Sequence, residues 1–268
     1  MLIFVRTNEP LRIMELNKIY NEDCRATMAR MSDGFIDLTV TSPPYDNLRD
    51  YNGYSFDFET IARELYRVTK PGGVVVWVVG DATIKGSETG TSFRQALYFM
   101  ECGFNLHDTM IYQKRSQPKQ NGYRYEQDFE YMFVLSKGKV NIKNPLTERC
   151  VNAGNKVTRT SRDNNSDELS TSKNIVSEVK IKGNVWFYGT KENESGHPAI
   201  FPEQLAADHI FSWSNDSELV YDPFAGSGTT PKMAHLQKRN WIGSEISSEY
   251  VGLAEKRLKP YLDQLMLF

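Results

Sequence analysis

The chain of 268 residues has little cysteine, no long apolar run and no excess of positive charge. Its three cysteines, Cys24, Cys102 and Cys150, are odd in number and far apart, a pattern typical of neither a disulfide framework nor a metal site. No apolar run approaches the roughly 18 residues of a membrane span, and residues 1–10 lack the basic-then-apolar order of a signal peptide. We therefore expect a cytoplasmic protein with no metal and no membrane contact.

Two glycine-dependent nucleotide motifs are also incomplete. Residues 219–230 (LVYDPFAGSGTT) are typical of a buried strand, a glycine turn and a helix start, where an α/β sheet receives a nucleotide-like ligand. Pro231 replaces the third glycine of a dinucleotide fingerprint and no Gly-Lys-Ser/Thr follows, which disfavours a pyrophosphate or P-loop site. Gly226 and Gly228 allow close backbone approach, and Glu245 ends the next strand candidate at the spacing of a ribose-binding carboxylate. These residues indicate an adenosine without a pyrophosphate.

A proline corner follows another strand candidate, at residues 36–40. The run Thr41-Ser42-Pro43-Pro44-Tyr45 places two rigid prolines, a hydroxyl and an aromatic ring where that strand ends. Pro44 restricts Pro43 to extended backbone, so the carbonyls of Ser42 and Pro43 point in fixed directions without competing N–H groups. Such a corner suits a planar group with an exocyclic amine, such as an unstacked nucleobase. Taken alone, the run is explained equally well as a strand followed by a Pro-Pro turn.

The net charge of −2 conceals two basic segments. Residues 112–125 have four basic residues and no acid, and residues 137–182 have ten Lys or Arg against five Asp or Glu. One face can therefore attract phosphates while the rest stays acidic, although ordinary solvated loops would share this composition. Interleaved aromatic rings favour nucleic acid. The first segment contains Lys114, Arg115, Lys119 and Arg124 together with Tyr112, Tyr123 and Tyr125.

Apolar runs alternate with helix-period segments along much of the chain, which predicts a doubly wound, mostly parallel α/β sheet. From about residue 139 to 195 the periodicity is lost apart from the aromatic cluster Val185-Trp186-Phe187-Tyr188, and we expect an insertion there. The predicted helices span 58–69 and 92–102, the first ended by Pro71-Gly72-Gly73, and the predicted strands span 74–79, 105–113 and 129–135.

Together these motifs resemble the β class of DNA amino-methyltransferases, the circularly permuted, SPPY-type enzymes that use S-adenosyl-L-methionine (AdoMet). Residues 42–45 look like the catalytic motif and residues 222–228 look like the AdoMet loop. Residues 197–203 resemble the family element that precedes this loop and helps hold the methionine end. Residues 21–24 resemble, more weakly, a segment with an acid near the adenine ring, because Glu22 stands where a glycine is usual. The order, catalytic motif first and AdoMet loop last, is that of the β class.

The resemblance implies a Rossmann-like sheet of seven strands in circularly permuted order. It divides the chain into a catalytic half at residues 1–138, an inserted target-recognition region at 139–195 and an AdoMet-binding half of the same domain at 196–268. It implies AdoMet as methyl donor with S-adenosyl-L-homocysteine as product, double-stranded DNA as substrate, and a prokaryotic or phage-encoded protein. A homodimer and a cognate restriction endonuclease are further partners that the resemblance suggests.

The resemblance also assigns the site residues. Tyr45 is expected to stack on a base flipped out of the duplex. The catalytic residues are Ser42, Pro43, Pro44 and Tyr45. The expected DNA contacts come from the charge pattern and not from the resemblance: Lys114, Arg115, Lys119 and Arg124 of the basic segment, and Arg49 in the loop after the proline corner. The cofactor-binding residues are Asp23, Thr41, His197, Pro198, Phe201, Asp222, Pro223, Phe224, Ala225, Gly226, Ser227, Gly228, Thr229 and Glu245.

The target amine and the substrate class stay open. Serine at the first motif position is commoner in enzymes that methylate N4 of cytosine and aspartate in those that methylate N6 of adenine, so Ser42 favours cytosine. Methylation of cytosine carbon 5 is disfavoured because each cysteine follows an acidic or basic residue, which excludes the Pro-Cys nucleophile of those enzymes. An RNA or protein methyltransferase, a catalytically silent DNA-binding module and a dinucleotide-dependent oxidoreductase are the alternatives, and Pro231 disfavours the last.

Overall fold

The chain forms two compact units in the computed structural model, which describes residues 2–5, 12–44, 56–114, 124–125, 127–162, 169–189 and 202–263. The large unit comprises Met1–Asn144 and Asn184–Phe268, and the inserted unit comprises Pro145–Gly183. The inserted unit is shorter than the insertion expected at 139–195. None of the helices among the described residues is both long and apolar enough to cross a membrane.

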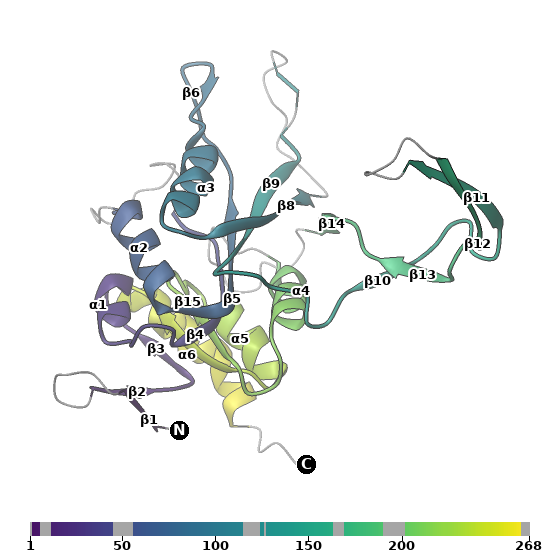
Figure 1. Ribbon diagram of the computed structural model, residues 1–268. Coiled ribbons are helices and arrows are strands. Elements are labelled where there is room, and N and C mark those ends of the chain that lie inside the picture. Colours follow the sequence, from purple (N-terminus) through teal and green to yellow (C-terminus); the bar gives the residue numbers. More distant parts are fainter. Residues whose placement is uncertain are drawn as a thin grey trace. The chain divides into compact units, whose positions relative to one another are not determined.

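An eight-stranded sheet forms the centre of the large unit (Figure 1). Seven of its strands run in one direction and β9 alone runs against its neighbours β5 and β8. The mostly parallel sheet is confirmed, but the expected number of seven strands is wrong, because the aromatic cluster expected in the insertion pairs with β8 as an edge strand. In spatial order the strands are β14 (Val185–Tyr188), β8 (Asn105–Lys114), β9 (Phe129–Ser136), β5 (Thr69–Val79), β4 (Ile36–Thr41), β15 (Leu219–Asp222), β16 (Asn240–Ser244) and β3 (Lys18–Tyr20).

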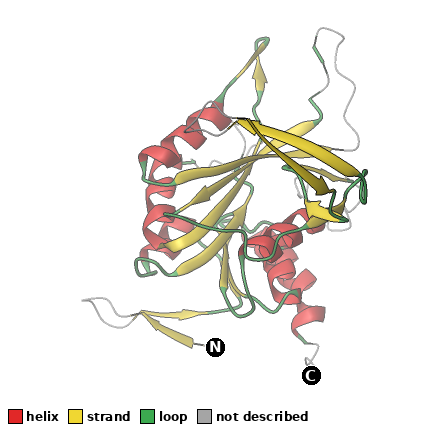
Figure 2. Ribbon diagram, turned by 45° about the vertical axis from the view of Figure 1, so that its right-hand side comes forward, coloured by secondary structure: helices red, strands yellow, loops and turns green. Residues whose placement is uncertain are grey.

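Helices cover both faces of this sheet (Figure 2). In α2, Ile61, Leu65 and Val68 recur at helical spacing and are buried, and Asp57 caps the helix by accepting from the Thr60 N–H at 3.3 Å. This confirms the predicted helix and its apolar face. One face carries α1 (Cys24–Ala29), α2 (Phe58–Val68) and α3 (Thr91–Glu101), and the other carries α4 (Glu203–Trp213), α5 (Thr229–Leu236) and α6 (Ser248–Leu262).

Strand β5 begins earlier than the sequence predicts. Pro71-Gly72-Gly73 lies inside the strand and does not form a loop before it. A Cβ atom on Gly73 would stand 2.8 Å from Cγ2 of Thr69 and 3.0 Å from the carbonyl oxygen of Asp37, so only glycine lets β5 pass β4 this closely. The register between the two strands shifts at the same place, between Ile36 and Leu38. Close backbone approach therefore explains Gly73, the last residue of the run expected from the sequence to end the preceding helix.

The remaining described strands form four two-stranded antiparallel sheets. Two belong to the large unit and two to the inserted unit, and the longest is the ribbon of β11 and β12. The pairs are β1 (Leu2–Val5) with β2 (Arg12–Glu15), β6 (Thr83–Ile84) with β7 (Ser87–Glu88), β10 (Thr147–Arg149) with β13 (Val179–Ile181), and β11 (Lys156–Arg162) with β12 (Leu169–Ile175).

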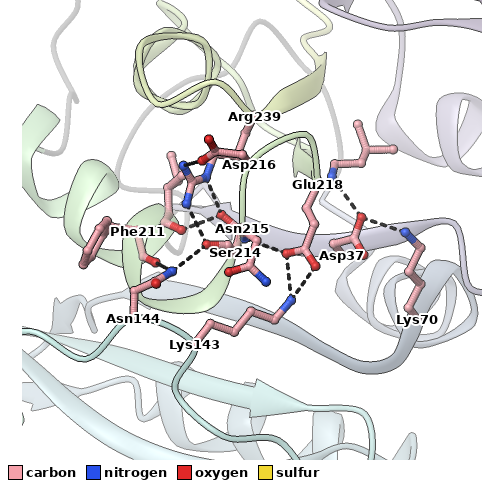
Figure 3. A network of polar contacts seen from close by, with 12 residues as sticks. Asp37, Lys70, Lys143, Asn144, Phe211, Ser214, Asn215, Asp216, Glu218 and Arg239 are labelled. Atoms are coloured by element: carbon pink, nitrogen blue, oxygen red, sulfur yellow. Dashed lines mark hydrogen bonds and ion pairs between the residues drawn. The ribbon is translucent and has the colours of Figure 1, made fainter.

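Asp37 joins the amino ends of three neighbouring strands (Figure 3). Its Oδ2 atom on β4 accepts from Nζ of Lys70 on β5 at 2.7 Å and from the backbone N–H of Leu219 on β15 at 2.9 Å. Backbone pairing between β4 and β15 covers only two residue pairs, Leu38 with Val220 and Thr39 with Tyr221. The Asp37 carboxylate therefore adds a side-chain link between β4 and β15 to their short backbone pairing.

The chain leading to the inserted unit is anchored within the same network (Figure 3). Nζ of Lys143 donates to both carboxylate oxygens of Glu218 at 2.7 Å. The side-chain amide of Asn144 donates to the carbonyls of Phe211 at 2.9 Å and Ser214 at 3.1 Å, at the end of α4. These carbonyls belong to a helix terminus, where the helix itself offers no donor. Asn144, the last residue before the inserted unit, is thereby fixed to the large unit.

Candidate active site

Three strand ends meet at the carboxyl edge of the sheet. Strands β4, β15 and β16 are adjacent and parallel, and they end at Thr41, Asp222 and Ser244. From β4 the chain continues to β5 on one side, and from β15 it continues to β16 on the other, so the strand order reverses between β4 and β15. Open α/β sheets bind their ligands at such a reversal, outside the carboxyl ends of the strands.

The proline corner follows β4 directly at this edge. Pro43 is buried, whereas Ser42 and Pro44 are partly exposed. Tyr45 lies outside the described residues. Thr41, which we predicted to bind the cofactor, is fully buried, and its hydroxyl donates to Oδ1 of Asp222 at 2.6 Å. This contact ties β4 to β15 immediately beneath the corner.

Asp222 is the most deeply buried acid of the site. Only 2% of the residue is exposed, and its Oδ1 atom accepts from the Thr41 hydroxyl and from the backbone N–H of Phe224 at 3.0 Å. Burial raises the pKa of Asp222 to about 6, and these hydrogen bonds oppose the rise. The carboxyl group therefore fixes the backbone at the start of the glycine loop by its hydrogen bond with Phe224.

The glycine loop owes its shape to two residues with positive φ. Gly226 has a φ of 50° and Gly228 has a φ of 79° and precedes α5. A Cβ atom on Gly228 would lie 3.1 Å from Cβ of Ala254 on α6, so this glycine also permits close helix packing. The backbone N–H of Gly226 donates to Oε2 of Glu245 at 2.9 Å. The loop is thus attached to the end of the next strand.

Glu245 uses both carboxylate oxygens to organise this edge. Oε2 accepts from Gly226, and Oε1 accepts from the backbone N–H of Ser247 at 2.8 Å, just before α6. The side chain is partly buried, and burial raises its pKa. Because each carboxylate oxygen has two lone pairs, each can accept one more hydrogen bond. The carboxylate is therefore able to accept two neighbouring hydroxyl groups, as the ribose of an adenosine requires.

An aromatic cluster supports the glycine loop from the side of α2 and α3. The ring of Phe224 lies 5.7 Å from that of Phe56 and 6.1 Å from that of Trp77. Nε1 of Trp77 donates to Oε1 of Gln95 at 2.8 Å, which fixes the indole ring. Phe56 follows residues 45–55, so the chain after the proline corner returns to the core beside the glycine loop.

Sequence reasoning missed Arg257, which contacts the glycine loop from α6. Its Nη1 atom donates to the carbonyl and hydroxyl oxygens of Ser227, both at 3.2 Å, and to the hydroxyl of Thr229 at 3.1 Å. Its Nη2 atom contacts Glu203 at the start of α4, and Glu203 also accepts from Nζ of Lys232 at 2.6 Å. The sequence signal for Arg257 was its position directly beside the residues of α6 that recur at helical spacing and are buried.

Asp23 has the contacts of a helix cap. Its Oδ1 atom accepts from the backbone N–H of Arg25 at 2.8 Å, and its Oδ2 atom accepts from Nη2 of the same residue at 2.7 Å. The Arg25 guanidinium lowers the pKa of Asp23. The same guanidinium reaches Asp57 at 3.2 Å, before α2. The cofactor contact expected of Asp23 stays a prediction.

The structure describes only some of the residues that were predicted to contact nucleic acid. Lys114 pairs with Glu130 at 2.5 Å, and Arg124 contacts the carbonyl of Gly86 and lies 3.6 Å from Glu88. The expectation that Tyr112 is available to nucleic acid is wrong, because this ring is buried in the sheet, whereas Tyr125 is fully exposed. The predicted residues outside the described part of the chain are Tyr45, Arg49, Arg115, Lys119, Tyr123, His197, Pro198 and Phe201.

The chemistry of the cysteines agrees with the absence of a Pro-Cys motif. Cys24 is buried, and burial raises the pKa of its thiol to about 12. A thiol of this kind is not a nucleophile at neutral pH. Within the ranges that the structure describes, no group of three or more His, Cys, Asp or Glu side chains could hold a metal ion.

Known proteins share both the sequence and the fold. Residues 36–256 match the DNA methylase family N6_N4_Mtase. The chain belongs to this N6/N4 DNA methylase family. The orphan methyltransferase M.BamHII of Bacillus amyloliquefaciens is 55% identical to this family member over 243 residues, which are 87% of this chain and 92% of M.BamHII. The type II methyltransferase M.SmaI of Serratia marcescens is 26% identical over 289 residues, 90% of each protein.

Solved structures confirm the fold of this family member. The PvuII DNA methyltransferase (cytosine-N4-specific) superposes with a TM-score of 0.67 at 19% identity, over 93% of this chain and 87% of its own. The M1.HpyAVI–SAM complex superposes with a TM-score of 0.61 at 22% identity, over 90% of this chain and 98% of its own. The protein is therefore a site-specific DNA methyltransferase of the N4/N6 family, as its motifs predict.

Proposed function

We propose that this DNA methyltransferase transfers a methyl group from AdoMet to the N4 amine of a cytosine flipped out of duplex DNA. The observation that carries the proposal is the meeting of the proline corner, the glycine loop and Glu245 at the ends of three adjacent parallel strands. The Thr41–Asp222 hydrogen bond links the first two directly. An amine held at the corner would therefore lie beside a nucleoside held by the loop.

The glycine loop and Glu245 are suited to AdoMet. Glu245 has a lone pair on each oxygen for the ribose hydroxyls, and the Gly226 backbone can approach the ligand closely. When bound, AdoMet supplies an electrophilic methyl group on a sulfonium sulfur. The M1.HpyAVI structure, which was solved with SAM, supports this choice of cofactor. The contacts of His197, Pro198 and Phe201 with the methionine end stay predictions.

The proline corner would activate the amine by orienting it. The lone pair of an exocyclic amine is delocalised into the base, so the nitrogen is a poor nucleophile until hydrogen-bond acceptors favour a tetrahedral geometry. The Ser42 side chain and the Pro43 carbonyl are these acceptors, and Tyr45 stacks on the base. Orientation and desolvation can lower such a barrier by roughly 7 to 11 kcal/mol. The proton leaves to the Ser42 hydroxyl or to water once the nitrogen is positively charged.

The choice of cytosine rests on Ser42, the first residue of the catalytic motif. The N6 amine of adenine would meet the same two acceptors, so adenine is the alternative target. The homodimer and the restriction endonuclease partner stay predictions from the family resemblance.

Replacing Ser42 with alanine tests the catalytic corner. Loss of one acceptor aimed at the reacting amine is expected to slow single-turnover methylation by roughly 10- to 100-fold, since a hydrogen bond of this kind contributes about 1.5 to 3 kcal/mol. AdoMet affinity, measured by calorimetry, should change less than twofold. Ser248→Ala, at an exposed position of α6, is the matched control and should leave both values unchanged. Equal losses of turnover and AdoMet affinity in Ser42→Ala would remove this role from Ser42.

A further inference from the structure

The short hairpin of β6 and β7 follows β5 in the chain and projects beyond α3 (Figure 1). Its strands pair Ile84 with Ser87, and Lys85 and Gly86 form the turn between them with φ angles of 50° and 81°. Two consecutive positive φ angles are typical of a type I′ turn, whose first position favours Asn, Asp or Gly. Lysine is uncommon in this backbone conformation, and strained residues of this kind cluster at functional sites.

The base of this hairpin is fixed between the end of β5 and the start of α3. The backbone N–H of Thr89 donates to the carbonyl of Ala82 at 2.9 Å, which closes the hairpin. Oδ1 of Asp81 accepts from the backbone N–H of Ser92 at 2.9 Å and from the hydroxyl of Thr89 at 3.3 Å. The tip of the hairpin is therefore held in one position by hydrogen bonds at its base.

The hairpin leaves the sheet beside the proline corner. Strand β5 is the parallel neighbour of β4, and Thr41, the last residue of β4, pairs with Trp77 of β5. Because parallel strands about 4.8 Å apart end at the same edge, the hairpin starts at the carboxyl edge that holds the candidate active site. From Val79, the last residue of β5, to Ile84 the chain can span up to about 17 Å. The tip therefore extends toward a duplex that delivers a base to the corner.

The tip combines an exposed aliphatic side chain with positive charge. Ile84 is 54% exposed, and Lys85 is exposed at the turn. Side chains alternate along a strand, so Ile84 lies on the face opposite Glu88, the one acid of the hairpin. Arg124 contacts the carbonyl of Gly86 and lies 3.6 Å from Glu88, and it offsets this acid. An apolar and positively charged tip suits stacked bases beside phosphates.

We propose that Ile84 enters the base stack of duplex DNA at the position that the target base leaves, while Lys85 contacts a phosphate beside it. Apolar side chains such as isoleucine act as wedges between bases in proteins that open or kink a duplex. Extrusion of a base exposes the faces of its neighbours, and an aliphatic side chain in the gap removes these faces from water. Ile84 is thus a positioning residue that stabilises the extruded state. The inference rests on the proposed function in taking a flipped base as the substrate, and it holds for cytosine and for adenine.

A substrate whose target base lacks a partner separates the wedge from the chemistry. The methylated site is first identified by sequencing the members of a random duplex pool that wild type methylates with AdoMet. Two duplexes then carry this site, one fully paired and one with an abasic position opposite the target base. Ile84→Ala should methylate the paired duplex roughly tenfold more slowly than wild type in a single turnover. The unpaired duplex should be methylated within about twofold of the wild-type rate, because an unpaired base costs less to extrude.

Two further variants make this comparison specific. Leu262→Ala removes a similar side chain, 43% exposed at the last residue of α6, and should keep both wild-type rates. Ser42→Ala should be slow on both duplexes, because Ser42 acts on the base after extrusion. Equal loss on both duplexes in Ile84→Ala, or a wild-type rate on the paired one, would overturn the wedge, as would a loss explained by a changed molecular mass in solution. A fast Ser42→Ala or a methylated adenine would contradict only the proposed function.

The phosphate contact of Lys85 has a separate readout. Lys85→Asn removes the charge and keeps the turn, because Asn-Gly is a preferred pair in type I′ turns. On the paired duplex, the slope of log affinity against log salt should fall by about 0.9. Lys259→Gln removes the same charge from an exposed position of α6 and should keep the wild-type slope. An unchanged slope in Lys85→Asn, or an equal fall in Lys259→Gln, would overturn this contact.

Discussion

Asp222 is a residue whose role the structure makes specific. The sequence places this acid at the start of the glycine loop, where the family resemblance implies contact with the cofactor. The structure shows a buried carboxyl that accepts from Thr41 and from the backbone of Phe224, and the contact with the cofactor stays a prediction. Its effect on the site is therefore to fix β4 and the glycine loop in one geometry.

The pKa of Asp222 gives this role a pH dependence. Because burial raises the pKa from 3.8 to about 6, folding favours the protonated carboxyl. The resulting stability is fully present below pH 4 and is lost as the pH rises through 6. Asp222→Asn keeps the shape but cannot ionise, so the free energy of unfolding of wild type should fall relative to the variant by on the order of 3 kcal/mol between pH 4 and pH 7.

Urea unfolding of both proteins at a series of pH values measures this difference. Carboxyls that lie away from Asp222, such as Asp23 with its lowered pKa, affect both proteins alike, so the difference reports Asp222 together with its electrostatic coupling to Glu245. A difference that stays constant, or that moves in favour of wild type as the pH rises, would contradict the raised pKa of the buried Asp222 carboxyl.

At the residue scale the sequence predicts which positions matter better than what each one does. The motifs place Gly226 and Glu245 at one ligand site, and the structure joins the two residues by a hydrogen bond, whereas the role of Ser42 stays a prediction. Thr41 and Asp222 form their hydrogen bond across 181 positions of the chain, and no local pattern encodes such a pair. The need for glycine at 228 arises partly from Ala254 on α6, which is also distant in sequence.

At the scale of elements, Arg257 connects α6 and α4 to the glycine loop. Removing its guanidinium leaves Ser227 and Thr229 without this partner, and hydrogen bonds from a charged donor contribute about 1.5 to 3 kcal/mol. Arg257→Ala is therefore expected to weaken AdoMet binding by roughly 10- to 100-fold. Arg257→Lys keeps the charge beside Glu203 but not the forked geometry, so it should recover only part of the affinity.

Calorimetry with AdoMet, together with binding to duplex DNA, separates this effect from general unfolding. Arg63→Ala is the matched control, because Arg63 is largely exposed on α2 and pairs with Glu59 one turn away. The Arg257 variants should bind duplex DNA as wild type does. Equal loss of AdoMet affinity in Arg63→Ala, or unchanged affinity in Arg257→Ala, would exclude a positioning role for Arg257.

The elements that the sequence misassigned involve contacts between distant strands. Residues 185–188 follow a long polar stretch and are only four in number, so their parallel pairing with β8 could not be seen locally. Pro71-Gly72-Gly73 has the composition of a turn, yet the close approach of β4 and β5 makes it part of a strand. The helices predicted at 58–69 and 92–102 and the strands predicted at 105–113 and 129–135, by contrast, agree with the structure to within one residue at each end, because their patterns are local.

At the scale of the whole molecule, the two units have different chemical properties. The large unit holds the proline corner, the glycine loop and Glu245 at one edge of a single sheet. The inserted unit consists of two short antiparallel pairs, one of them basic. The residues of the proposed methyl-transfer site all belong to the first unit, and sequence recognition by the second stays a prediction from the family resemblance.

The identity of the methylated nucleoside shows whether the methyl group is transferred to the N4 amine of cytosine. The protein is incubated with isotopically labelled AdoMet and a pool of mixed-sequence duplexes, the DNA is digested to nucleosides, and the labelled product is identified by mass and chromatography. We expect labelled N4-methyl-2′-deoxycytidine from wild type and its loss in Ser42→Ala. Labelled N6-methyladenine would contradict the choice of cytosine, and label on carbon 5 of cytosine would contradict methyl transfer to an amine at the Ser42-Pro43-Pro44 corner.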